Sequence, residues 1–130
     1  MQSLQSAAQR AREIGIAPLI LSDCIEGEAR EVAQVHAGIA QSVAHHGEPL
    51  RAPVVLLSGG ETKVTLGEAV PGRGGRNAEF LLALGLALQQ TPNISAIACD
   101  TDGIDGSEDN AGAVWSADSL VKARSKNIDL

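Results

Sequence analysis

The stretch PVVLLSGGETKVTL, residues 53–66, followed closely by GRGGRNAEFLLALGLAL, residues 72–88, predicts the fold of this chain. It begins with an apolar run typical of a buried strand. Ser58-Gly59-Gly60 then indicates a turn, and the β-branched residues of 62–66 predict a further strand that returns from it. After the glycine-rich loop, residues 77–90 are predicted to be helical. Strand, turn and helix in succession are typical of an α/β domain.

The remaining elements continue this alternation. Asp23 and Glu26 have capping-box spacing, and the apolar residues from Val32 to Val43 recur at steps of three and four, which predicts an amphipathic helix. Further elements are expected at residues 4–13 (helix), 18–21 (strand), 94–99 (strand) and 117–125 (helix). The fold predicted for residues 1–130 is one three-layer α/β/α domain with a mixed, mostly parallel sheet.

Composition excludes several classes of protein. The chain has 130 residues, a net charge of −6 and two aromatic residues of the Phe, Trp and Tyr class, Phe80 and Trp115, which argues against nucleic-acid binding. Cys24 and Cys99 lie far apart and are expected to be reduced. With no signal peptide and no apolar run long enough for a bilayer, the sequence predicts a soluble, cytoplasmic protein without membrane contact. Its oligomeric state, homo-oligomers included, is left open.

The loop GRGGRN, residues 72–77, predicts an anion site. Its glycines free the backbone, the helix that follows has a positive N-terminal end, and Arg73 and Arg76 suit carboxylate or phosphate oxygens. The loop lacks the Lys-Ser/Thr of a phosphate-binding Walker loop, and Asn77 stands where a dinucleotide fingerprint has its third glycine. The alternative is a surface loop with two solvated arginines.

Acidic residues crowd the segment DTDGIDGSEDN, residues 100–110, which suggests a Mg²⁺ site. The alternative is a solvated loop with two Asp-Gly turns. Three apolar runs end in polar residues, and if the strands are parallel these ends share one edge of the sheet, where ligands bind. The three histidines, His36, His45 and His46, are expected on the surface of a helix. The helix at 77–90 is apolar on nearly every side, so it is either central to this domain or faces a further domain or subunit.

Four stretches resemble the glycerate 2-kinase family, whose leucine-rich C-terminal region is called the MOFRL domain and whose members are often named hydroxypyruvate reductase. They are LSDCIEGEARE (21–31), LLSGGETKVT (56–65), GRGGRNAEF (72–80) and TDGIDGSEDNAGA (101–113). The resemblance implies ATP- and Mg²⁺-dependent phosphorylation of glycerate at its 2-hydroxyl, in a cleft between two α/β domains. It also implies that this chain is a fragment, inactive alone, whose partner is a missing N-terminal domain and which stops before the last C-terminal segment.

The resemblance assigns roles to matching positions. Catalytic roles fall on Arg76, Asp102 and Glu61, and metal binding on Asp102 and Asp105. Substrate or phosphate binding falls on Ser58, Gly59, Gly60, Thr62, Arg73, Gly74, Gly75, Asn77 and Glu79. Two positions depart from the family pattern: Ala78 replaces the usual glutamine, and Asp100 stands where a small residue is typical, so membership of Asp100 or Asp109 in the metal site is left open. The competing hypotheses are an NAD(P)H-dependent hydroxypyruvate reductase and a non-catalytic ligand-binding or interaction domain.

Overall fold

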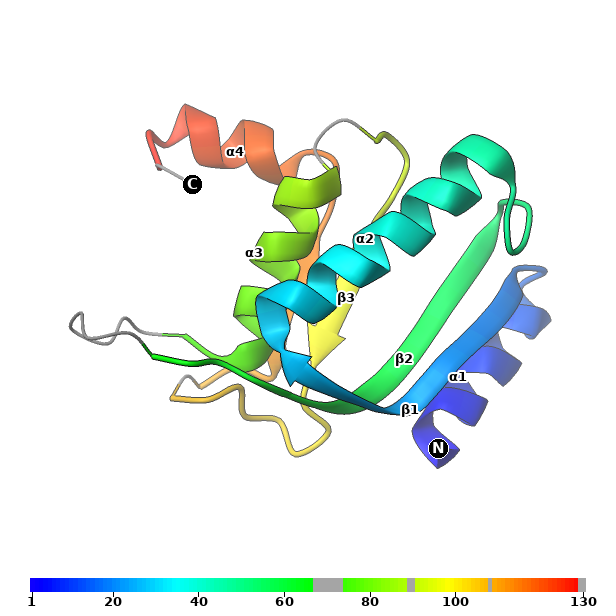
Figure 1. The fold of residues 1–130 in the computed structure, drawn as a ribbon, viewed down its shortest axis with the longest axis horizontal. Coiled ribbons are helices and arrows are strands. Elements are labelled where there is room, and N and C mark those ends of the chain that lie inside the picture. Colours follow the sequence, from blue (N-terminus) through cyan, green and yellow to red (C-terminus); the bar gives the residue numbers. More distant parts are fainter. Residues whose placement is uncertain (67–73, 89–90, 108, 129–130) are drawn as a thin grey trace.

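The computed structural model describes residues 1–66, 74–88, 91–107 and 109–128, which form an α/β fold (Figure 1). Its elements are α1 (Gln2–Glu13), β1 (Ala17–Glu28), α2 (Ala29–His46), β2 (Val54–Lys63), α3 (Arg76–Leu88), β3 (Ala96–Cys99), β4 (Gly112–Trp115) and α4 (Ser119–Ser125). The predicted end of α3 at residues 89–90 and the last residues of the chain lie outside this description. Among the described helices, none is both long and apolar enough to cross a membrane.

The first sheet consists of β1 and β2, which pair in parallel with Ser22 opposite Ser58. Asp23 and Glu26 lie inside β1, so the predicted capping box is wrong; α2 begins only at Ala29, without a side-chain cap. β1 is longer than predicted because its polar second half, from Ser22 to Glu28, also pairs with the backbone of β2.

The second strand also continues through its predicted turn. Ser58-Gly59-Gly60 lies within β2, and residues up to Lys63 stay paired with β1, so the returning strand predicted at 62–66 is wrong. Gly60 has a φ of +149°, and a Cβ there would overlap the backbone of Ile25. The glycine therefore permits close pairing of two strands rather than a reversal of the chain.

The first sheet lies between helices. Ser58 contacts His36 of α2, whereas its neighbour Gly59 faces Leu4 of α1. Because successive residues of a strand point to opposite faces, α1 and α2 cover opposite sides of this sheet. The β1–β2 pair therefore has one helix on each side.

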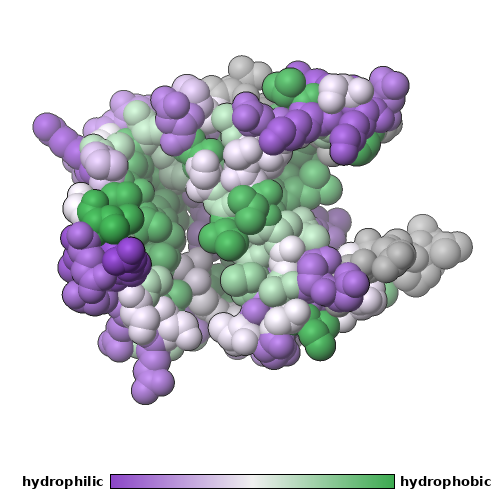
Figure 2. Space-filling view, turned by 180° about the vertical axis from the view of Figure 1, so that it is seen from behind, coloured by the Kyte–Doolittle hydropathy of each residue, from purple (hydrophilic) through white to green (hydrophobic). Residues whose placement is uncertain are grey.

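The second sheet consists of β3 and β4, which are antiparallel. The α/β class is thus confirmed, but the described residues form two separate two-stranded sheets rather than one mostly parallel sheet. β4 was not predicted, because its four residues give too short a pattern to recognise. Ile97 of β3 lies opposite Val114 of β4, and the two side chains are 70% and 71% exposed, respectively. In the view from behind, apolar surface gathers at the middle of the molecule (Figure 2).

The core joins α2 and α3 to the second sheet. Its buried members are Ala33, Ala37, Leu81, Leu84, Leu88, Trp115 and Leu120. α2 therefore buries a stripe of alanines, while Val35, part of the predicted apolar face, is 63% exposed. Small side chains let α3 pack closely against α2 and β4, and Gly85 of α3 lies directly against the ring of Trp115 in β4. α3 buries one face this way and leaves Leu82 47% exposed.

Candidate active site

The start of α3 is capped by Asp105, from the acidic loop between β3 and β4. This side chain is 0% exposed. Its Oδ1 accepts hydrogen bonds from the backbone N–H of Asn77 at 3.0 Å and from Asn77 Nδ2 at 3.1 Å, and its Oδ2 accepts from the Ala78 N–H at 3.0 Å. A Cβ at position 75 would overlap this carboxylate, so Gly75 is the residue that lets the acidic loop reach the helix. A buried charge is tolerated here because it meets helix N–H donors.

The glycine-rich loop therefore faces an anion supplied by the chain itself. The N–H groups of Asn77 and Ala78 are engaged by Asp105 and are not open to a ligand. Arg73 and Gly72, the other half of the predicted loop, lie outside the described residues. The anion-binding roles predicted for this loop consequently depend on Arg76 and on its surroundings.

Arg76 is fixed by two carboxylates. Its Nη1 donates to Glu61 Oε1 and its Nη2 to Asp100 Oδ1, both at 2.9 Å. These contacts raise the pKa of Arg76 above its usual value, the Asp100 hydrogen bond contributing most. Asn77 Nδ2 donates to the other oxygen of Asp100 at 2.9 Å. Since a guanidinium carries five N–H donors, Arg76 is oriented by these partners and keeps further donors for a ligand.

The two predicted metal ligands occupy different environments. Both oxygens of Asp105 accept N–H hydrogen bonds, so this buried carboxylate does not fit a Mg²⁺ ligand. Asp102 is exposed, and its Oδ1 accepts from the Ile104 N–H within its own loop at 3.1 Å. In the ranges that the structure describes, no group of three acidic, His or Cys side chains could hold a metal. Asp102 alone stays a predicted ligand. A single carboxylate is compatible with Mg²⁺ binding, because Mg²⁺ often takes only one or two protein carboxylates and completes its coordination with water and substrate phosphates.

His36 was not expected in the site region, yet it joins three elements. Its Nδ1 lies 2.8 Å from the Val32 carbonyl oxygen and its Nε2 2.9 Å from Ser58 Oγ. A carbonyl only accepts, so Nδ1 carries the proton, and in the neutral ring Nε2 accepts the Ser58 hydroxyl. The ring meets Phe80 of α3 edge-on, with centroids 5.2 Å apart. His36 thus links β2 near Glu61 to α3 near Arg76. In the sequence, the only indication that His36 faces inward is its position four residues after Val32, on the same side of the helix.

An open groove of about 1140 Å³ lies beside these residues. Of the predicted site residues, Thr62, Gly74, Gly75, Arg76 and Glu79 line it, whereas Ser58, Gly59, Gly60 and Asn77 do not. Arg30 from the first turn of α2 and Lys63 from the end of β2 complete its polar side. Leu82 and Leu86 of α3 form an apolar side. The structure therefore gathers residues from α2, β2 and α3 around one concave surface.

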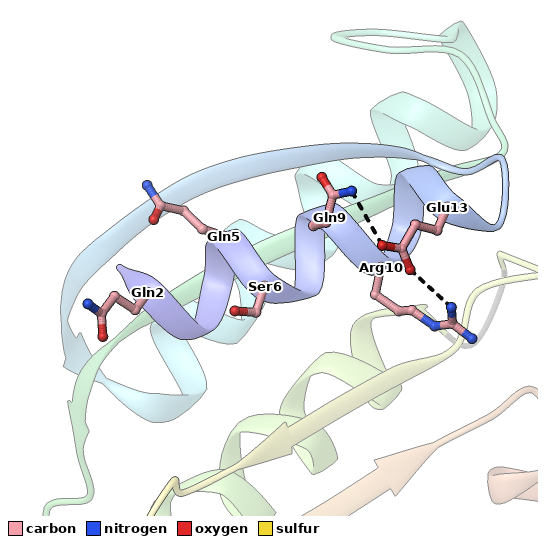
Figure 3. A pocket seen from close by; sticks show the side chains of 6 residues that line it. All are labelled: Gln2, Gln5, Ser6, Gln9, Arg10 and Glu13. Carbon is pink, nitrogen blue, oxygen red and sulfur yellow. Dashed lines mark hydrogen bonds and ion pairs between the residues drawn. The ribbon is translucent and has the colours of Figure 1, made fainter.

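A smaller hollow of about 680 Å³ runs along α1 (Figure 3). Its lining comes entirely from one polar helix face, where Gln9 and Arg10 both bond to Glu13. It contains none of the predicted site residues, and we assign it no chemistry.

Residues 54–130 match the model of the MOFRL family, which is more than half of the chain. The chain belongs to the MOFRL family. The match covers β2, the glycine-rich loop, α3 and the acidic loop, whereas α2, which contributes Arg30 and His36, lies outside it. The chain spans about 30% of the length of the family's longer proteins described next.

This MOFRL chain is 55% identical over 127 residues to an Agrobacterium vitis protein provisionally named hydroxypyruvate reductase, covering 98% of this chain and 29% of that protein. It is 37% identical to the glycerate 2-kinase of Pyrococcus horikoshii, covering 98% and 29%. The crystal structure of a glycerate kinase from Thermotoga maritima superposes with a TM-score of 0.85 at 32% identity, covering 97% of this chain and 30% of that one. The fold described above is therefore that of the corresponding part of a glycerate kinase.

Proposed function

We propose that this chain is the C-terminal domain of a glycerate 2-kinase. In the complete enzyme it contributes one wall of an interdomain cleft in which ATP phosphorylates the 2-hydroxyl of D-glycerate. The observation that carries the proposal is the superposition on a glycerate kinase over 97% of the chain. An N-terminal domain, supplied by a longer polypeptide, provides the other wall, and the isolated domain does not turn over.

The arrangement of the site supports phosphoryl transfer. That reaction is catalysed chiefly by positioning and by charge stabilisation, and it needs no nucleophile from the protein. Arg76 is a cation held in place by Glu61 and Asp100 at the edge of an open groove. We assign Arg76 to an anionic oxygen of glycerate or of the transferred phosphoryl group, and Glu61 to the orientation of Arg76. We assign Asp102, an exposed residue of the acidic loop, to holding or orienting Mg²⁺ beside the phosphates.

A hydroxypyruvate reductase is the second candidate, favoured by the provisional name of the Agrobacterium vitis relative. A dinucleotide site of the usual kind places its pyrophosphate on the N–H groups at a helix start. At the start of α3 Asp105 takes two of these N–H groups. This argues against a nicotinamide dinucleotide on this domain and favours the kinase.

The test is an assay of the longer polypeptide with ATP, Mg²⁺ and D-glycerate. Arg76→Ala is expected to lower kcat/KM by about 100-fold or more, as loss of an oriented transition-state donor does in other enzymes. Arg124→Ala, on the exposed side of α4, is the matched control and is expected to be unaffected. Full turnover by Arg76→Ala would exclude the catalytic role, and NAD(P)H oxidation with hydroxypyruvate in the absence of ATP would establish the reductase instead.

A further inference from the structure

We infer that His36 of α2 is a positioning residue for Arg76. By fixing where β2 and α3 lie relative to each other, it holds Glu61 at the distance from which its carboxylate orients the Arg76 guanidinium. The inference deepens the proposed kinase function and rests on it. It gives a role in the reaction to a side chain that belongs to neither the glycine-rich loop nor the acidic loop.

The ion pair between Glu61 and Arg76 is too weak to hold its own two elements together. Glu61 lies in β2 and is 74% exposed, whereas Arg76 begins α3. An ion pair with one partner this exposed contributes about 1 kcal/mol or less. The 2.9 Å between Arg76 Nη1 and Glu61 Oε1 therefore depends on how other contacts place β2 against α3.

Helix α2 contacts both β2 and α3 (Figure 1). On the β2 side, His36 Nε2 accepts a hydrogen bond from the Ser58 hydroxyl at 2.9 Å. On the α3 side, the same ring meets Phe80 edge-on. The carbonyl oxygen of Val32, 2.8 Å from Nδ1, fixes the orientation of the ring. The half-buried imidazole thus connects the strand to the helix.

The contacts of His36 lie close in the sequence to the ion pair. Ser58 precedes Glu61 by three residues, and β2 is paired with β1 across this interval, so a fixed Ser58 also fixes the backbone at Glu61. Phe80 follows Arg76 by four residues, which places both on one face of α3. Loss of the imidazole would therefore change the separation of the two ionic side chains.

A second link between α2 and α3 supplies a matched control. Gln41 Nε2 donates to the Ala87 carbonyl oxygen at 3.0 Å, at the end of α3 far from Arg76. His36→Leu and Gln41→Leu each remove one side-chain hydrogen bond between α2 and a neighbouring element, and both introduce leucine. A purely structural role predicts similar effects of the two substitutions on turnover once both proteins are folded, whereas positioning of Arg76 predicts an effect for His36 alone.

The first test measures kcat in the longer polypeptide with ATP, Mg²⁺ and D-glycerate. His36→Leu is expected to lower kcat by about 10- to 100-fold, because displacement of a catalytic group by about 1 Å can cost that much. Gln41→Leu is expected to leave kcat unchanged, and thermal melts verify that both variants are folded at the assay temperature. In an Arg76→Ala background, His36→Leu should cause no further loss, since residues that act as a unit are not additive.

Phe80→Leu tests the same link from the α3 side. It keeps an apolar side chain against the core and removes the ring that His36 meets. It is expected to lower kcat in the same direction as His36→Leu, and the double variant should lose less than the product of the single effects. This variant keeps the inference falsifiable if His36→Leu does not fold.

The second test needs no turnover. In this chain, NMR of the Arg76 guanidinium, assigned by the loss of its signals in Arg76→Ala, measures rotation about the Nε–Cζ bond. Rotation is expected to be slow in the unmodified chain, because two carboxylates hold the group. It should become faster in His36→Leu and stay unchanged in Gln41→Leu.

Three outcomes would each overturn the inference. They are equal kcat values for His36→Leu and Gln41→Leu, additive losses when His36→Leu is combined with Arg76→Ala, and unchanged guanidinium rotation in His36→Leu. Faster rotation in His36→Leu, together with no kinase turnover by the unmodified longer polypeptide, would reject the proposed function alone.

Discussion

Asp105 and Asn77 are joined by a hydrogen bond of 3.0 Å between a buried carboxylate and the backbone N–H at the start of α3. The two residues are 28 positions apart in the chain, so the bond fixes the acidic loop to the helix. Together with the hydrogen bond from the Ala78 N–H, it commits the N–H groups at the start of α3 to a contact within the chain.

Replacing Asp105 by Asn is expected to lower the free energy of unfolding by about 1–3 kcal/mol, because one N–H donor of α3 then faces an amide NH₂ instead of an oxygen. Urea denaturation measures the change. The matched control is Asp102→Asn, at an exposed position where the amide oxygen can still accept from Ile104, and it is expected to stay within about 0.5 kcal/mol. Equal losses in both variants would show that Asp105 is not the cap.

Gly85→Ala is expected to destabilise the protein by about 1–3 kcal/mol, since the new methyl group would overlap the Trp115 ring in a packed core. Gly38→Ala is the matched control, because nothing lies within 4 Å of its added Cβ in helix α2. That control is expected to stabilise the protein by up to about 1 kcal/mol through helix propensity. Thermal or urea unfolding would detect the opposite signs, and a stable Gly85→Ala variant would contradict the packing of α3 on β4.

The two carboxylates on Arg76 are expected to differ in their effect on stability. Glu61 is 74% exposed, so Glu61→Gln should cost less than about 1 kcal/mol. Asp100 is 17% exposed and also accepts from Asn77, so Asp100→Asn should cost about 1–3 kcal/mol. Urea denaturation of each variant compares them. A larger loss at Glu61 than at Asp100 would contradict the stronger contribution expected from the more buried carboxylate.

His36 and Ser58 are expected to be coupled. His36→Gln and Ser58→Ala should each destabilise the protein, and a double-mutant cycle should give an interaction energy of about 0.5–3 kcal/mol, as for residues in direct contact. Urea unfolding of the two single variants and the double variant supplies the cycle. His45→Gln, at an exposed position of the same helix, is the control and is expected to be neutral. Additive losses would mean that the hydrogen bond to Ser58 contributes nothing.

Glu28 is expected to titrate below its ordinary pKa of 4.5, chiefly because the Thr65 hydroxyl and N–H donate to its carboxylate. A folded-state pKa below the unfolded one means that this stabilisation is present above about pH 4.5 and is lost as the pH falls through the folded-state pKa. NMR titration of the Glu28 carboxyl carbon gives the value. Thr65→Val removes the hydroxyl and should move the pKa upward, and an unchanged midpoint would contradict the contact.

Much of the fold follows from local patterns. The apolar run at the start of β2 and the leucine-rich α3 are recognisable because their periodicity reflects burial over a few adjacent residues. The glycine-rich loop was likewise predicted to precede a helix, and α3 begins at Arg76. The parallel register of Ser22 with Ser58, the short strand β4 and the alanine face of α2 were not predictable in this way. Each depends on a partner far along the chain, which periodicity does not encode.

The sequence by itself determined that the region around Arg76 concentrates glycine, arginine and carboxylate chemistry at a helix start. Only the tertiary structure decided how these groups combine. The positive end of a helix stabilises a nearby carboxylate, and Gly75 leaves room for Asp105 to reach the start of α3. Because Asp105 is buried, its carboxylate needs hydrogen-bond donors, and the helix N–H groups supply them. Arg76 is therefore oriented by the chain's own acids, Glu61 and Asp100, which lie 15 and 24 positions away from it in the sequence.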